Sequence, residues 1–243
     1  MTILREFCSN FTKIKRTPML LLHLLLPVAV TALFLAYYAV GGYRIIPDVR
    51  SFFILVLLCY PIFVGITVPV FTRPDRTIHG TQNALGLVAS RKSVYLGKLL
   101  FLLFFSAINV IIYEVCFYIG VTMFLNMDMT SPGLYAAIFC IFILSSLFTY
   151  LLHLPAAFRF GSSISVLLGI SGTILAGLFE NPIGDKIWMF IPWEWGIRFL
   201  ESYLNMSDAS VLPGIISMLL MTLAILVLSL LWFDRWEGRS VQE

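Results

Sequence analysis

Six long apolar runs determine what this chain can fold into. Each run is about as long as an α-helix must be to cross the hydrocarbon core of a bilayer, roughly 20 residues. The apolar residues are continuous rather than alternating, which excludes a transmembrane β-barrel. Only 12% of the 243 residues are charged, whereas soluble domains carry about 25%. We expect membrane-spanning helices over residues 19–40, 52–71, 99–125, 134–158, 163–179 and 214–233.

The distribution of Lys and Arg predicts how these helices are oriented. Cytoplasmic segments next to membrane-spanning helices are enriched in Lys and Arg. Twelve of the 16 Lys and Arg residues fall on one side of the predicted membrane. They lie before the first helix, between the second and third, between the fourth and fifth, and after the sixth. We therefore predict that both termini are cytoplasmic.

Residues 1–17 are too short and too charged to cross a membrane. Their apolar side chains repeat with a helical period, and Pro18 follows them. This pattern predicts an interfacial helix lying on the inner leaflet; the alternative is an ordinary charged flank of the first span. The predicted apolar face consists of Leu4, Phe7, Cys8, Phe11 and Ile14.

A polar, basic segment, residues 73–98, separates the second and third spans. It is long for a simple connection. Asp75 and Thr77 are suited to cap a helix whose later part is basic. Two interpretations follow from the residues alone: a rigid cytoplasmic helix that receives force from a soluble motor, or a positively charged loop that fixes the topology.

Motifs for catalysis and for metal binding are absent from the sequence. No phosphate-binding loop, HExxH or GxSxG motif occurs, and the three His and four Cys residues show no metal-ligand spacing. The small net charge of +3 does not indicate nucleic-acid binding. We predict a chain that is not an enzyme and binds no cofactor, metal or nucleic acid, so that energy for any transport must come from a gradient or a partner.

Two spans carry polar or small residues with a predicted role. Glu114 lies near the middle of the third span, where a charged carboxylate is costly; it is expected to contact a cationic substrate or, alternatively, to be protonated and bonded to a neighbouring helix. A different face of this span is predicted to pack against other helices; it contains Ser106, Asn109, Tyr113 and Gly120.

Small residues recur every four positions in the fifth span and allow close helix packing; they are Ser165, Gly169, Thr173 and Gly177.

Residues 180–213 form the largest segment on the opposite side. They interleave aromatic with acidic residues, and Pro182 and Pro192 interrupt helices. Because Trp and Tyr favour the membrane interface, we expect short helices that dip into the outer leaflet. Trp193, Glu194 and Trp195 are the predicted contacts to a cationic peptide; the alternative is an aromatic cap without substrate contact.

The whole chain resembles the ABC-2-type transporter permeases, and among them the lantibiotic-immunity permeases of the MutG/EpiG type. Three stretches carry the resemblance: "KIKRTPMLLLHLLLPVAVTALFLAYY", "DRTIHGTQNALGLVASRKSVYLGKLL" and "NPIGDKIWMFIPWEWGIRF". Their order and spacing match a basic interfacial helix with a first span that contains His and Pro, a coupling helix between the second and third spans, and short re-entrant or surface helices between the fifth and sixth. One departure is the pair Asp75-Arg76, where many of these permeases have a Glu-Glu-like pair.

The resemblance implies an all-α fold with six transmembrane helices in a single domain, residues 1–243. It implies a bacterial cytoplasmic-membrane complex with an ATPase dimer, which would bind ATP and Mg, and with a second, different six-span permease. The small residues of the fifth span would face that permease, or else pack within this subunit. The complex would expel a lantibiotic or a similar cationic antimicrobial peptide. The alternatives are an exporter of another amphiphile or drug, and a scaffold or sensor without a motor. The predicted ATPase contacts are Thr77, Gly80, Thr81, Gln82, Leu85 and Leu87.

Overall fold

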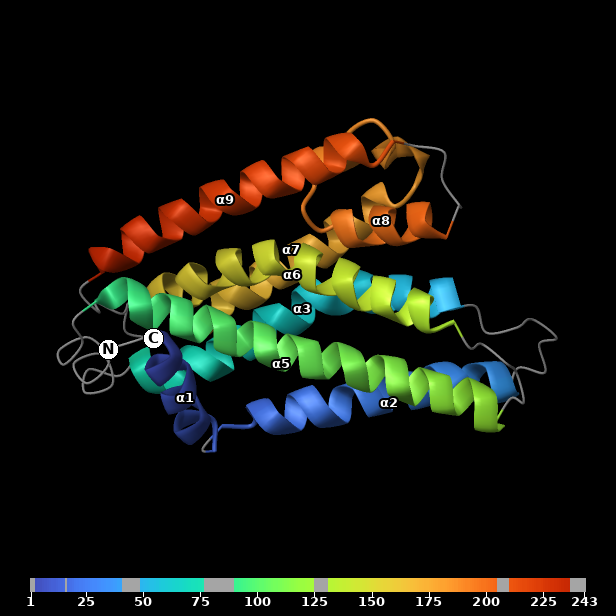
Figure 1. Ribbon diagram of the computed structural model, residues 1–243, viewed down its shortest axis with the longest axis horizontal. Coiled ribbons are helices and arrows are strands. Elements are labelled where there is room, and N and C mark those ends of the chain that lie inside the picture. Colours follow the sequence, from blue (N-terminus) through green and yellow to red (C-terminus); the bar gives the residue numbers. More distant parts are fainter. Residues whose placement is uncertain are drawn as a thin grey trace.

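The computed structural model describes residues 3–15, 17–40, 49–76, 90–124, 131–204 and 210–236, which form an elongated bundle of helices (Figure 1). No strand occurs within these ranges. Six helices are long and apolar enough to cross a membrane, which confirms a multi-pass, all-α membrane protein. They are α2 (Met19–Val40), α3 (Val49–Arg76), α5 (Arg91–Ile119), α6 (Pro132–Phe160), α7 (Ser162–Phe179) and α9 (Leu212–Asp234).

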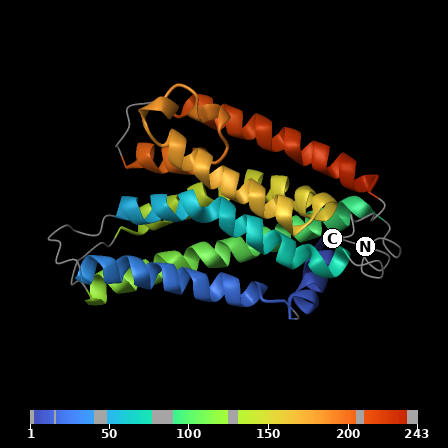
Figure 2. The ribbon, with the colours of Figure 1, turned by 180° about the vertical axis from the view of Figure 1, so that it is seen from behind.

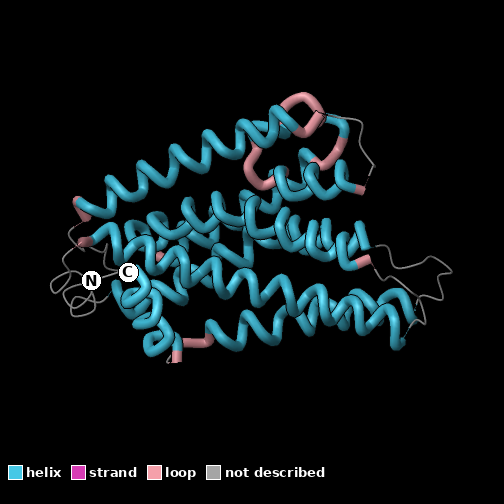
Figure 3. Tube along the Cα trace, in the orientation of Figure 1, coloured by secondary structure: helices cyan, strands magenta, loops and turns pink. Residues whose placement is uncertain are grey.

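Shorter helices lie at the two ends of the bundle. The helix α1 (Ile3–Ile14) lies at one end, and η2 (Pro182–Gly184), η3 (Trp188–Phe190) and α8 (Trp195–Tyr203) lie at the other (Figure 1). Irregular turns join η2, η3 and α8 to each other and to α7 (Figure 3). A π-helical turn, η1 (Gly120–Phe124), continues α5 at its end. The short helices thus flank the six long ones rather than adding a seventh span.

The Lys and Arg residues that were assigned to one side of the membrane lie at one end of the bundle. We call the end that carries α1, the start of α5 and the end of α9 the basic end; it includes Lys13, Arg73, Arg91, Lys92, Lys98, Arg159 and Arg235. The opposite end is the aromatic end. It is defined by Trp188, Phe190, Trp193, Trp195, Phe199 and Tyr203.

The helices α3 and α5 are longer at the basic end than the sequence predicts. The expected second span ends at residue 71, but α3 continues to Arg76, and α5 begins at Arg91 instead of residue 99. Asp75 therefore lies in the last turn of α3, and the segment that it was predicted to cap lies outside the described residues. Ser90 caps α5 instead, because its hydroxyl accepts a hydrogen bond from the backbone N–H of Ser93 at 3.4 Å. The apolar period alone missed these turns because they contain charged residues.

Two prolines inside long helices leave backbone carbonyls that neighbouring helices satisfy. Pro27 has no N–H, so the carbonyl of His23 loses its bond within α2. Asn109 of α5 donates its Nδ2–H to that carbonyl at 3.1 Å. In the same way, Ser229 of α9 donates to the carbonyl of Leu151, four residues before Pro155 in α6, at 3.4 Å. In an apolar medium such bonds are needed at a proline, so these contacts fix α2 to α5 and α6 to α9.

The helix α3 lies at the centre of the bundle and is the most buried of the six spans. Its Tyr60 hydroxyl bonds to the hydroxyls of Ser106 in α5, at 2.6 Å, and of Tyr150 in α6, at 2.9 Å. These partners satisfy a polar group that would otherwise be costly to bury. The packing face predicted for α5 is confirmed, since Ser106, Asn109, Tyr113 and Gly120 are all buried.

Candidate functional site

The residues predicted to contact an ATPase lie outside the described residues. All six belong to residues 77–89, which the structure does not describe: Thr77, Gly80, Thr81, Gln82, Leu85 and Leu87. The structure instead describes the two helix ends between which this segment runs. Those two ends, at Asp75 and Ser90, contain the best-defined charged site at the basic end.

A buried ion network joins α1, α3 and α5 beside the 77–89 segment. Asp75 accepts a hydrogen bond from Lys13 at 2.8 Å through one carboxylate oxygen and from Lys98 through the other. The side chain of Lys98 is 1% exposed and that of Asp75 is 5% exposed. Lys98 also lies 3.5 Å from the amide oxygen of Asn10. Because an unpaired buried charge is strongly destabilising, these bonds hold the three helices together at this point.

The helix α1 lies directly against α5. A Cβ added to Gly97 would come within 2.6 Å of the Cβ of Glu6, so only glycine permits this approach. Phe7 and Phe11 pack edge-on against Phe101, as expected for part of the predicted apolar face. Leu4, by contrast, is 71% exposed. The inward face of α1 contains the polar residues Glu6 and Asn10, which hydrophobic periodicity does not predict.

The small residues of α7 pack within the chain. A Cβ on Gly65 of α3 would lie 2.8 Å from the carbonyl oxygen of Ser165. Gly169 is similarly close to the backbone of α3 at Pro61, and Ser165 also bonds to His153 of α6 at 3.0 Å. Gly177 faces Leu58 of α3 at 3.7 Å. Ser165 and Gly169 therefore pack against α3 of the same chain, and the interface with a second permease stays a prediction. The hydroxyl of Thr173 is buried without a hydrogen-bond partner among the described residues.

A second ion network lies at the aromatic end. Arg198 of α8 forms salt bridges with Asp185 at 3.0 Å, Glu194 at 3.3 Å and Glu201 at 3.6 Å. It also donates to the backbone carbonyl of Phe179 at 2.7 Å, which ties α8 to the end of α7. Glu201 extends the network to α3, because it accepts a hydrogen bond from Arg50 at 2.6 Å.

Glu194 is the buried carboxyl of this network. One of its oxygens has no hydrogen-bond partner among the described residues, and the other accepts from Arg198. Burial raises the pKa of Glu194 to about 8, although the positive charge of Arg198 acts in the opposite direction. At neutral pH the protonated form therefore predominates, and the two arginines face the two remaining carboxylates of Asp185 and Glu201.

The predicted substrate contacts at the aromatic end have different surroundings. Trp195 is fully buried, donates its indole N–H to the carbonyl of Met189 at 2.9 Å and packs edge-on against Phe148. Glu194 is also fully buried. Trp193 is half-buried and lies over Gly172, where a Cβ would be 2.6 Å from its indole nitrogen. Glu194 and Trp195 thus pack inside the segment in this conformation, and their contact with a substrate stays a prediction.

Glu114 lies in the half of α5 that is next to η1. One oxygen of its carboxyl group is buried without a hydrogen-bond partner in the described part of the chain. Tyr118, one turn further along the same face, packs edge-on against Tyr135 of α6. The carboxyl group thus faces a neighbouring helix, and contact with a cationic substrate stays a prediction.

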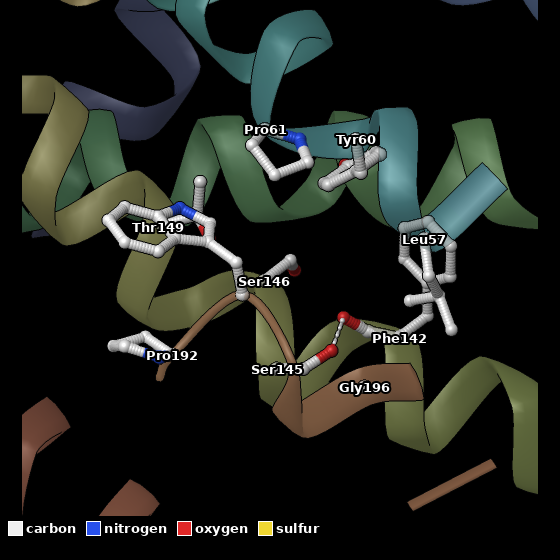
Figure 4. A pocket seen from close by; sticks show the side chains of 10 residues that line it. Leu57, Tyr60, Pro61, Phe142, Ser145, Ser146, Thr149, Pro192 and Gly196 are labelled. Atoms are coloured by element: carbon white, nitrogen blue, oxygen red, sulfur yellow. Dashed lines mark hydrogen bonds between the residues drawn. The ribbon is translucent and has the colours of Figure 1, made fainter. Parts of the chain in front are cut away.

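A small hollow lies between α3, α6 and the loop before α8 (Figure 4). Ser145 and Ser146 line it, but their hydroxyls donate to backbone carbonyls of α6, at 2.7 Å to Ile141 and at 3.0 Å to Ile143. The Tyr60 hydroxyl is bonded as described above. Trp193 also lines the hollow, and its buried indole N–H has no hydrogen-bond partner among the described residues. The hollow therefore offers few unused polar groups to a ligand.

Sequence reasoning missed the two ion networks. Each one joins residues far apart in the chain, such as Arg50 and Glu201. One signal was available for the basic end: Asp75 and Lys98 stand at matching depths on two successive antiparallel helices, with opposite charges. For the aromatic end no local pattern pairs Arg50 with α8.

Comparison with known proteins does not assign the chain to a family. Within the described residues, no group of three or more His, Cys, Asp or Glu side chains is arranged to hold a metal ion. The chain matches no model of a known protein family and no curated protein.

Proposed function

We propose that the chain is the membrane subunit of an ABC transporter in the bacterial cytoplasmic membrane, with both termini and the 77–89 segment in the cytoplasm. A separate ATPase dimer, which binds ATP and Mg, supplies the energy. The observation that carries this proposal is the ion network of Lys13, Asp75 and Lys98. It joins α3 and α5, the two helices between which the 77–89 segment runs, to each other and to α1.

This attachment is suited to transmit force. A displacement of the 77–89 segment would act on α3 and α5 through the bonded pair Asp75 and Lys98. From α3 it would reach α7, because the two backbones are in contact at Gly65 and Gly169 and cannot slide without a clash. A loop that only sets topology needs positive charge but no buried carboxylate, so the network favours the coupling interpretation over the topology loop.

The substrate that we propose is a lantibiotic or a similar cationic, amphiphilic peptide, expelled from the membrane to protect the cell. The exposed residues of the aromatic end support this class. Ile183 is 71% exposed and Phe190 is 65% exposed, and the carboxylate of Asp185 beside them is 56% exposed. A surface with both apolar and acidic groups is complementary to a peptide that is both hydrophobic and positively charged. Glu194 and Trp195 would hold this surface in place from below.

Purification of the full chain from its native membrane tests the motor. We expect an ATPase with a phosphate-binding loop to copurify, together with a second permease. Single cysteines at positions 80–87 should cross-link to that ATPase in a nucleotide-dependent pattern, whereas a cysteine in place of Ser207 should not. Recovery of an intact chain without any ATPase would contradict the proposal.

A resistance assay tests the substrate. Asp185→Asn and Phe190→Ser should each lower resistance of cells to the peptide without lowering the yield of the complex. Phe124→Ser is the matched control, since Phe124 is a 79% exposed aromatic residue at the same end but outside the 180–213 segment. Full resistance in the double variant would exclude this surface as the peptide contact.

A further inference from the structure

A groove on the outside of the bundle combines apolar walls with one cation. Its floor is α6, and its sides are α7 and α9, which run in roughly the same direction in Figure 2. It lies at the basic end and has a volume of about 410 Å³, within the range of pockets that bind small ligands. The apolar lining includes Leu152, Ala156, Ile164, Leu168, Leu228 and Trp232.

The cation at this groove is Arg159, near the end of α6. Its side chain is exposed, and its guanidinium lies 5.0 Å from the ring of the adjacent Phe160. Other basic residues at this end are engaged: Lys13 and Lys98 with Asp75, and Lys92 with Asp234. In the part of the chain that the structure describes, Arg159 has no salt bridge. Its charge is thus available to an anion at the mouth of the groove.

The first turn of α7 adds to the attraction for an anion. Gly161 precedes this turn with φ 92° and provides no side-chain cap. The hydroxyl-bearing residues Ser162 and Ser163 follow it and are exposed. Backbone N–H groups at a helix start lack partners within the helix and favour negative charge. These N–H groups lie only a few residues from Arg159 in the chain. They belong to the same turn as Ile164, which lines the side of the groove.

We propose that this groove binds one anionic phospholipid. The phosphate is held by Arg159 beside the first turn of α7, and an acyl chain lies along the apolar floor of α6. Trp232 lines the same end of the groove, and its indole ring suits the headgroup depth. A second copy of the chain fits less well, because a symmetric contact through this groove would bring Arg159 to apolar walls without a carboxylate. The lipid site does not depend on the proposed transport function.

A second lipid-facing groove provides an internal contrast. It lies between α2 and α5 with η1, has a volume of about 520 Å³ and is lined by Val28, Ala32, Leu35, Ala36 and Phe124, among others, with no charged residue. Because this groove is apolar and has no cation, we expect it to bind the acyl chains of lipids whatever their headgroup. Selectivity for anionic lipid should therefore come from Arg159.

Native mass spectrometry of the full chain tests the site. The purified protein is mixed with equal amounts of phosphatidylglycerol and phosphatidylcholine that carry the same acyl chains. Wild type should retain phosphatidylglycerol preferentially. Arg159→Gln should reduce this preference about fivefold, the effect of one basic side chain at an anionic surface. Arg73→Gln removes an exposed charge at the same end, outside the groove, and should leave the preference unchanged.

The walls of the groove give a test that leaves Arg159 in place. Leu228→Trp fills the groove from α9 and should lower retention of phosphatidylglycerol. Leu231→Trp changes an exposed residue of the same helix that does not line the groove and should have no effect. Equal retention of both lipids by wild type would overturn the proposal, as would an equal loss with Arg73→Gln. A particle of twice the chain mass without bound lipid would assign the groove to a second copy.

Discussion

The two ends of the bundle each contain a buried ion network, but the two are balanced differently. At the basic end, the single carboxylate of Asp75 lies between two lysines. At the aromatic end, Arg50 and Arg198 meet three carboxyl groups, of which Glu194 is the most buried. In the first network each oxygen of one carboxylate accepts a hydrogen bond from a different lysine, whereas in the second network burial raises the pKa of Glu194 to about 8. The protonation state of the aromatic end therefore depends on pH near neutrality.

Labelling of single cysteines should separate the two ends completely, which is the largest effect that we expect. In a background without the four native cysteines, Ser93→Cys and Ser240→Cys should be shielded from an impermeant thiol reagent in intact cells, and Ser207→Cys should react. All sites should react after the membrane is permeabilised. Reaction of Ser93→Cys from outside would reverse the orientation and remove the basis for contact between the basic end and an ATPase.

Removal of the Asp75 charge should be the most destabilising substitution. Asp75→Asn leaves Lys98 buried without the carboxylate to which it is hydrogen-bonded, and breaking a buried pair in this way costs about 3–5 kcal/mol. Lys98→Met should cost less, because Asp75 keeps its bond to Lys13. Unfolding in mixed detergent micelles, followed by circular dichroism, measures both. Equal stability of Asp75→Asn and wild type would show that the network is not a structural attachment.

The pH dependence of stability should be located at the aromatic end. Burial raises the pKa of Glu194 from 4.5 to about 8, so the folded state binds this proton more tightly than the unfolded state. The stability contributed by the protonated group is complete below about pH 4.5 and is lost as the pH rises towards 8. Wild type should therefore become less stable between pH 5 and pH 8, and Glu194→Gln should flatten this trend. Glu180→Gln, in the same segment, should keep the wild-type slope.

A single hydrogen bond between helices should have the smallest effect. Ser229→Ala removes the donor to the Leu151 carbonyl, and such bonds between membrane helices contribute about 0.6 kcal/mol on average. Ser217→Ala on the same helix is the control, since its hydroxyl only approaches the sulfur of Met221 at 3.6 Å. The same unfolding assay compares them. A loss above that of Lys98→Met would show that the proline sites, and not the ends, dominate stability.

The six spans could be predicted from the sequence because hydrocarbon permits only long apolar helices. Their ends were harder to predict where charges are neutralised in pairs. Lys98 interrupts an apolar run, yet α5 continues through it because Asp75 lies opposite. The face of α1 was only partly predictable, since Glu6 and Asn10 turn inward towards α5. The pattern of apolar residues in one helix does not show where the neighbouring helix will pack.

The candidate sites were less predictable for a related reason. The small residues of α7 indicated close packing but did not name the partner helix; within this chain the backbone of α3 meets α7 at Gly65. In the sequence, Glu194 and Trp195 indicated an exposed surface that is aromatic and acidic. Their burial depends on Arg198, Phe148 and the carbonyl of Met189, contacts that arise only once the helices are assembled.

The bonds at the two prolines have a consequence for biogenesis. The helix α2 enters the membrane before α5 is synthesised, and α6 enters before α9. Until the later helix arrives, the carbonyls of His23 and Leu151 lack the side-chain donors that they have in the finished bundle. An unsatisfied carbonyl in hydrocarbon is unfavourable. The early helices are therefore completed by helices made later, and a chain cut short before α9 would leave α6 with an exposed polar group for the quality-control machinery of the membrane to recognise.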